Sequence, residues 1–158
     1  QGGPGVKTLF LPQGTALLVG GSGSLMVGDN FGIGLGGYSL ANELVIQMPT
    51  HKRDLGLSYG GLEWDYSILR KRLFYLNFSC MTGVGQAFAV PRLTGADRIQ
   101  SNFYYIDPQF NIMLNVTHEL RFDLGVGYFA TAGADLKGTL GTELNGFNLQ
   151  ILLFYGKL

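Results

Sequence analysis

The chain has 158 residues, which is enough for one domain with a complete core. Charged residues make up 14% of it, against roughly 25% in an ordinary soluble domain, and the formal net charge is +0. This balance excludes a basic nucleic-acid-binding surface. Hydrophobic residues reach 46% but come in short pieces, which excludes a membrane-spanning helix of about 18 or more apolar residues.

Alternation of apolar and polar residues with a period of two predicts β-strands along nearly the whole chain. The first four expected strands cover residues 6–11, 15–27, 31–40 and 54–68. Within 54–68 the alternation changes phase at Gly60-Gly61, where we expect a β-bulge that bends the sheet. The glycine pairs Gly20-Gly21 and Gly36-Gly37 are expected to act in the same way.

Four more strands are expected at residues 74–80, 104–116, 120–128 and 147–155, which brings the count to eight. The segment 104–116 is the clearest, because Phe110 and Ile112 fall on one face while Asp107 and Asn111 fall on the other. Aromatic residues gather near the expected strand ends, as is typical of interfacial girdles in membrane barrels. They are Trp64, Tyr66, Phe74, Tyr75, Phe103, Tyr104, Tyr105, Tyr128, Phe129, Phe154 and Tyr155.

The connections between the expected strands alternate in length. Tight turns at 28–30, 69–72 and 117–119 alternate with longer links at 41–53, 91–102 and 133–145. Outer-membrane barrels show this asymmetry between their two ends. The short first link, Pro12-Gln13-Gly14, departs from it. We therefore expect one domain over 1–158, with residues 1–14 either a loosely attached N-terminal segment or a first strand.

The composition of the two faces decides which one points outward. The polar face consists of Gly, Asn, Gln and Ser with few charges, whereas a water-facing sheet would carry many Lys and Glu. The apolar face is too bulky for the inside of an eight-stranded barrel. We predict an all-β fold, an antiparallel up-and-down transmembrane β-barrel of about eight strands. The lipid-facing residues are expected to be Phe110, Ile112, Leu114, Phe122, Leu124, Val126, Leu149, Ile151 and Leu153.

Charged residues on the polar face would lie inside the barrel, where each must be paired or hydrated. The expected network in the lumen consists of Glu63, Asp65, Asp107, Asn111, Arg121 and Asp123. Such a network would plug the lumen and argues against an open pore. Its excess of carboxylates also leaves open a cation or proton site. The single cysteine, Cys80, and the absence of zinc spacings lead us to expect no metal site and no cofactor.

One set of residues is a candidate for a catalytic site. His51 lies in a long link close to Asp54 in sequence, and Ser58 or Ser39 would lie at the same rim. Small outer-membrane barrels that hydrolyse or transfer lipid chains use a serine, a histidine and an acid. A solvated loop histidine is the simpler interpretation of His51.

Five glycine and aromatic motifs resemble those of a family of short, largely uncharacterised, exported bacterial proteins of outer-membrane β-barrel type. They are Gly20-Gly21-Ser22-Gly23, the run Gly34 to Leu40, Tyr59-Gly60-Gly61-Leu62-Glu63, Tyr104 to Pro108, and Arg121 with Gly125 to Tyr128. The resemblance covers residues 18–158, although the chain ends in Gly156-Lys157-Leu158 where family members end in Gly-Lys-Phe. It implies a membrane barrel and no established activity or catalytic residue.

We therefore expect a non-enzymatic barrel of the bacterial outer membrane, acting as a structural element or an accessory subunit of an envelope assembly. The chain begins Gln1-Gly2-Gly3 without a signal peptide, so either the numbering starts after its removal or the protein is not exported, and we expect the first. The expected partners are membrane lipid, other envelope proteins or copies of the chain, and no nucleic acid. The lipid-facing surface and the loops 41–53, 91–102 and 133–145 would carry the contacts, and an unpaired or weakly paired first strand could also join neighbouring copies. The alternatives are a soluble or secreted barrel that binds an apolar ligand and, third, a lipid-modifying enzyme.

Overall fold

The structure is a computed structural model that describes residues 2–12, 14–42, 44–47, 52–70, 73–91, 99–117, 119–133 and 144–155. Every regular element within these ranges is a β-strand. Across the same ranges, no helix has the length and apolar character needed to cross a membrane.

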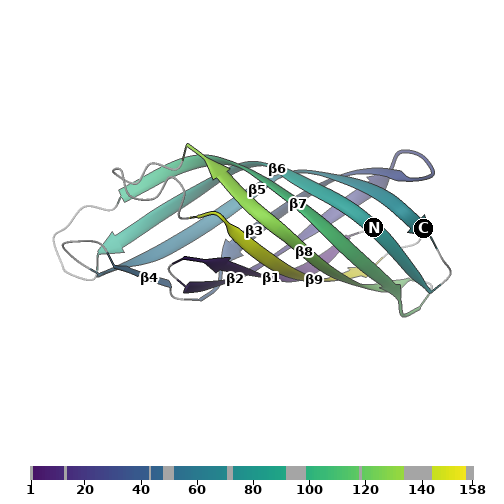
Figure 1. The fold of residues 1–158 in the computed structure, drawn as a ribbon, viewed down its shortest axis with the longest axis horizontal. Helices are drawn as coiled ribbons and strands as arrows, with labels where there is room; N and C mark the ends of the chain where they lie inside the picture. The colour runs from purple at the N-terminus through teal and green to yellow at the C-terminus, as the bar shows by residue number, and fades with distance from the viewer. Residues whose placement is uncertain are drawn as a thin grey trace.

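Nine strand segments follow one another along the chain (Figure 1). They are β1 Gly2–Leu11, β2 Gly14–Met26, β3 Phe31–Leu40, β4 Leu44–Gln47, β5 Lys52–Arg70, β6 Phe74–Pro91, β7 Ile99–Asn115, β8 Leu120–Ala132 and β9 Gly146–Tyr155. Because β3 and β4 both pair with β5, they are two successive segments at one position in the wall. The wall therefore has eight positions.

The wall is closed and antiparallel throughout. Each of the eight positions pairs with its neighbours along the chain, with β3 and β4 both on β5, and β1 also pairs with β9, for example at Val6 and Ile151. Closure removes the free edges that an open sheet would expose. The predicted fold class, an all-β up-and-down transmembrane barrel of eight strands, is confirmed.

The N-terminal residues form a full strand of this wall. β1 pairs with β2 from Gly2 to Leu11 and with β9 over most of the same length. Of the two expectations for residues 1–14, the structure places Gly2–Leu11 as a first strand. The idea of a weakly paired first strand that joins neighbouring copies is wrong, because both sides of β1 are already hydrogen-bonded within the chain.

The two ends of the barrel differ. Short turns at 27–30 and 116–119 lie at the end where Gly2 pairs with Tyr155, at the right in Figure 1. We call this the short-turn end. At the far end, Leu11 pairs with Gly14 in a tight hairpin. The expected links 91–102 and 133–145 lie mostly outside the described residues, whereas most of 41–53 is described and contains β4 and the start of β5, so it is not a simple loop.

The bulge expected at Gly60-Gly61 is absent. Register runs without a shift through both glycines against β3 and β6, and the irregularity lies between Ser67 and Leu69 instead. The inward positions of β5 simply change in character along the strand. They carry Leu57 and Tyr59 before the glycines and Glu63 after them, so an unbroken strand looks like one that changes phase. Register is also unbroken at the other two glycine pairs.

The interior has two halves. Toward the far end it is mainly apolar, with the buried side chains Leu9, Leu18, Leu55, Leu57, Tyr59, Phe103, Tyr105 and Phe129. Toward the short-turn end it is mainly polar, with the buried side chains Ser24, Glu63, Asp65, Asn77, Ser79, Asn111, Arg121 and Asp123. This division corrects two expectations. The interior is not only glycine and amide, and Phe103, Tyr105 and Phe129 point inward rather than joining an aromatic girdle, whereas Trp64, Tyr104 and Tyr128 are exposed.

Candidate functional site: the barrel lumen

An ion pair crosses the middle of the lumen. Lys7 Nζ of β1 lies 2.6 Å from Asp107 Oδ2 of β7, and both side chains are fully buried. Gln109 Nε2 donates a hydrogen bond of 2.8 Å to the same oxygen, and Asn148 Nδ2 donates one of 2.8 Å to Oδ1. Three donors around one carboxylate offset the cost of burying its charge.

Aromatic rings cover the ion pair on the side of the far end. Lys7 Nζ lies 4.5 Å from the ring centre of Tyr38 and 5.8 Å from that of Tyr59, within the range of cation–π attraction. Tyr59 and Tyr105 have ring centres 4.8 Å apart, and Tyr105 stacks on Phe129 at 5.3 Å. Rings from β3, β5, β7 and β8 therefore meet inside the lumen, where they replace water with side chains.

The polar half of the lumen lies on the other side of the ion pair. Asn77 Nδ2 donates to Asp65 Oδ1 at 3.3 Å, and Asn111 Nδ2 donates to Ser79 Oγ at 2.9 Å. Asp123 on β8 and Glu63 on β5 are both buried in this half of the lumen. Carboxylates of β5 and β8 thus lie in the same polar half of the lumen.

The structure places all six residues of the expected network inside the barrel: Glu63, Asp65, Asp107, Asn111, Arg121 and Asp123. Sequence reasoning missed Lys7, Gln109 and Asn148 as the partners of Asp107. Gln109 and Asn148 carried a signal, since both occupy polar positions of the alternation. Lys7 carried a weaker one, as a single charge within an apolar stretch.

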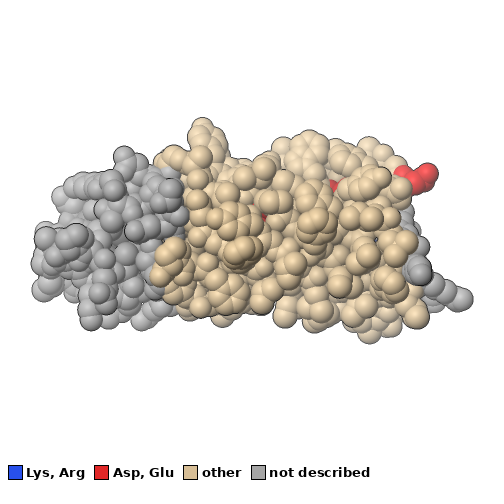
Figure 2. Space-filling model, viewed as in Figure 1, with Lys and Arg blue, Asp and Glu red and all other residues tan. Residues whose placement is uncertain are grey.

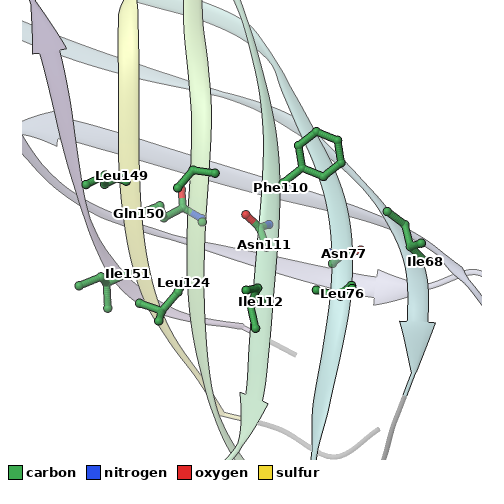
Figure 3. A pocket seen from close by; sticks show the side chains of 12 residues that line it. Ile68, Leu76, Asn77, Phe110, Asn111, Ile112, Leu124, Leu149, Gln150 and Ile151 are labelled. Atoms are coloured by element: carbon green, nitrogen blue, oxygen red, sulfur yellow. The ribbon is translucent and has the colours of Figure 1, made fainter.

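The expected lipid-facing residues lie on the outside of the wall. Eight of them are exposed and Phe122 is half-buried. A groove on this outer face runs over β5 to β9 and is lined by apolar side chains such as Leu76, Phe110 and Leu124. Figure 3 shows Phe110, Ile112 and Leu124 spread along β7 and β8 beside Leu149 and Ile151 of β9. Acyl chains of a bilayer match a surface of this composition.

Most of the described charged side chains lie inside the barrel, whereas those of a water-soluble protein lie mainly on its surface. Among the charged side chains that the structure describes, Lys7, Glu63, Asp65, Asp107, Arg121 and Asp123 are buried. Asp29 and Glu119 lie outside, and both belong to turns of the short-turn end. Figure 2 accordingly shows almost no blue or red over the described strands, apart from a red patch at the right-hand end.

The candidate catalytic set does not form a site in the described residues. His51 lies outside them, and of Asp54 they include only the backbone, which pairs with Val45 and Val90. Ser58 pairs with Gln86 and alternates with the buried Leu57 and Tyr59, so its side chain faces the outside of the barrel. Ser39, its neighbour on β3, is exposed.

An apolar outside and a lumen filled by an ion pair and aromatic rings define the class, an eight-stranded transmembrane β-barrel with a plugged interior. Among solved structures the chain is similar to Ail, the attachment invasion locus protein of Yersinia pestis, with a TM-score of 0.55 over 98% of this chain and 93% of that chain. The sequences are 8% identical, so the likeness shows the fold alone. No family model and no curated protein matches the sequence, and the family resemblance stays a prediction.

Proposed function

We propose that the protein is a non-enzymatic β-barrel of the bacterial outer membrane that serves as a structural element or an accessory subunit of an envelope assembly. The observation that carries the proposal is the buried ion pair between Lys7 and Asp107. A channel or a carrier for an apolar ligand needs an open lumen, whereas this pair and the rings above it occupy the middle of the barrel. The exposed apolar wall supports a membrane location.

Membrane insertion is tested by purification and gel mobility. The protein should require detergent to stay in solution, and an unheated sample should migrate differently from a boiled one in an SDS gel, as a closed barrel resists the detergent. A protein that purifies as a monomer in plain buffer would instead support the soluble, ligand-binding alternative.

The plugged lumen is tested by single-channel recording in planar bilayers. We expect no discrete conductance steps, because the lumen is blocked at Lys7 and Asp107. A barrel that has inserted, as shown by protease protection in matched vesicles, and still conducts would contradict the structural role.

The accessory role is tested by isolating the tagged protein from envelope fractions with mild detergent, where a fixed set of accompanying envelope proteins is expected.

A further inference from the structure

A hollow on the outer face of the barrel lies over β5, β6 and β7, toward the far end. Its volume is about 550 Å³. Three polar residues, Ser58, Gln86 and Asn102, line it together with Val84 and Tyr104. The outer wall of this barrel is otherwise mainly apolar, so three polar side chains gathered in one hollow set this part of it apart.

The three polar residues form one row across the strands. Ser58 pairs with Gln86, and Gln86 pairs with Asn102. Directly paired residues of an antiparallel sheet have Cβ atoms about 4.5–5.5 Å apart, so one ligand can contact neighbouring members of the row. We call Ser58, Gln86 and Asn102 the polar row. The adjacent row contains Gly60, which pairs with Val84 and has no side chain to fill the space in front of it.

The polar row lies where the apolar part of the wall ends. On β7 the outward side chains from Leu114 to Tyr104 are apolar or aromatic, and Asn102 is the first polar one beyond them. On β5, the exposed Leu62 precedes Ser58 in the same direction. Aromatic residues such as Tyr104 mark the headgroup level of a bilayer. The row therefore lies at the depth of lipid headgroups.

The chemistry of the hollow is neutral. None of the described residues that line it carries a charge. It therefore offers neither the Arg or Lys that recognises a phosphate nor a carboxylate for an ammonium group. Hydroxyl and amide side chains can both donate and accept hydrogen bonds, as the hydroxyl groups of a sugar do. Within the described part of the chain, the side chains of the polar row have no hydrogen-bond partner, so they are available to a ligand.

We propose that this hollow binds the neutral sugar headgroup of a membrane glycolipid. The polar row would hydrogen-bond to the sugar hydroxyls, and the ring of Tyr104, which is 71% exposed, would lie against the sugar ring. Val84 and the apolar wall beside it would contact the start of the acyl chains, which favours a lipid over a soluble saccharide. The inference rests on the membrane location in the proposed function and adds a class of ligand to it.

The test is native mass spectrometry of the whole protein in a polyoxyethylene detergent, because a detergent with a sugar headgroup would compete. Digalactosyldiacylglycerol and phosphatidylglycerol with the same acyl chains are added separately. We expect the galactolipid to bind at least about tenfold more tightly, as two or more additional hydrogen bonds would provide. Equal binding, or tighter binding of phosphatidylglycerol, would overturn the proposal. So would displacement of the galactolipid by soluble lactose at similar concentrations, because the ligand would then be a free saccharide.

Variants locate the binding in the hollow. Gln86→Leu/Asn102→Leu should lose the preference for the galactolipid, because two members of the polar row can no longer form hydrogen bonds. Gln100→Leu is the matched control, since Gln100 is exposed on the same face of β7, two residues from Asn102, and does not line the hollow. It should keep the preference. If the double variant does not fold, Asn102→Leu decides, and a preference equal to that of the control would contradict the site.

The proposed function and the glycolipid site can fail separately. A protein that purifies as a monomer in plain buffer would remove the membrane location, and the glycolipid site with it. A protein that needs detergent and shows heat-dependent gel mobility, but binds both lipids alike, would keep the membrane location and lose only the site. Gel mobility is measured for each variant as well, so that a loss of folding is not taken for a loss of binding.

Discussion

Asp107 connects three strands in the middle of the lumen, through Lys7 of β1, Asn148 of β9 and its neighbour Gln109 on β7. The carboxylate is fully buried, so its stability depends on these donors. The residue is therefore the point at which a single change should have the largest effect on the interior.

Lys7→Met should lower the free energy of unfolding by about 3–5 kcal/mol, because it leaves a buried charge without its counterion. The measurement is urea unfolding in lipid vesicles, followed by the fluorescence of Trp64 on the outer face. The double variant Lys7→Met/Asp107→Asn should recover most of the loss, since no charge remains. The new amide oxygen at position 107 can accept from one of the two neighbouring amides, and the other neighbour can turn its own oxygen toward the new NH₂ group. Equal losses in the single and double variants would contradict this account.

Gly85 makes room for the aromatic rings of the far half. A Cβ atom on Gly85 would lie 2.3 Å from the Phe103 ring and 2.8 Å from Cβ of Tyr59. Gly85→Ala should therefore lower the free energy of unfolding by about 1–3 kcal/mol through overpacking. Gly37→Ala is the matched control, because its nearest neighbour would be an ordinary contact at 3.4 Å, and its unfolding curve should change much less.

At the scale of the strand, alternation decides which substitutions the membrane tolerates. Ile112 and Gln100 both lie on the outer face of β7, but Gln100 lies near the far end of the strand. Ile112→Arg should lower the free energy of unfolding by about 2–4 kcal/mol in vesicles, as for a charge near the middle of the bilayer, whereas Gln100→Arg should be nearly neutral. Similar losses at both positions would mean that the apolar band extends to the strand end.

The strands and the direction of their side chains, inward or outward, could be predicted from the alternation in the sequence. In residues 104–116 and 120–128 it assigned inside and outside correctly, because most inward residues there are polar or glycine and most outward residues are apolar. In β5 it failed, because Leu57 and Tyr59 face inward as Glu63 does. A strand whose inner face is apolar in one half and acidic in the other looks the same in sequence as a strand with a bulge.

At the scale of the whole molecule, contacts between strands that are distant in sequence account for what the sequence failed to predict about the candidate site. Inward glycines such as Gly85 leave space that rings from other strands fill, so the volume available inside depends on partners that are distant in sequence. For the same reason Lys7 and Asp107, 100 positions apart, could not be paired from sequence. Their contact requires β1 to close the wall against β9, which brings β1 to a position three strands away from β7.

The placement of charge has a consequence for encounters in the plane of a bilayer. Among the side chains that the structure describes, six charged ones are turned inward and Asp29 and Glu119 lie at one end, so these side chains present almost no electric field along the wall to neighbouring molecules. Lateral recognition along this wall then depends on shape and on lipid displaced from grooves, and it should be insensitive to ionic strength. Salt would alter contacts only where the barrel emerges into water.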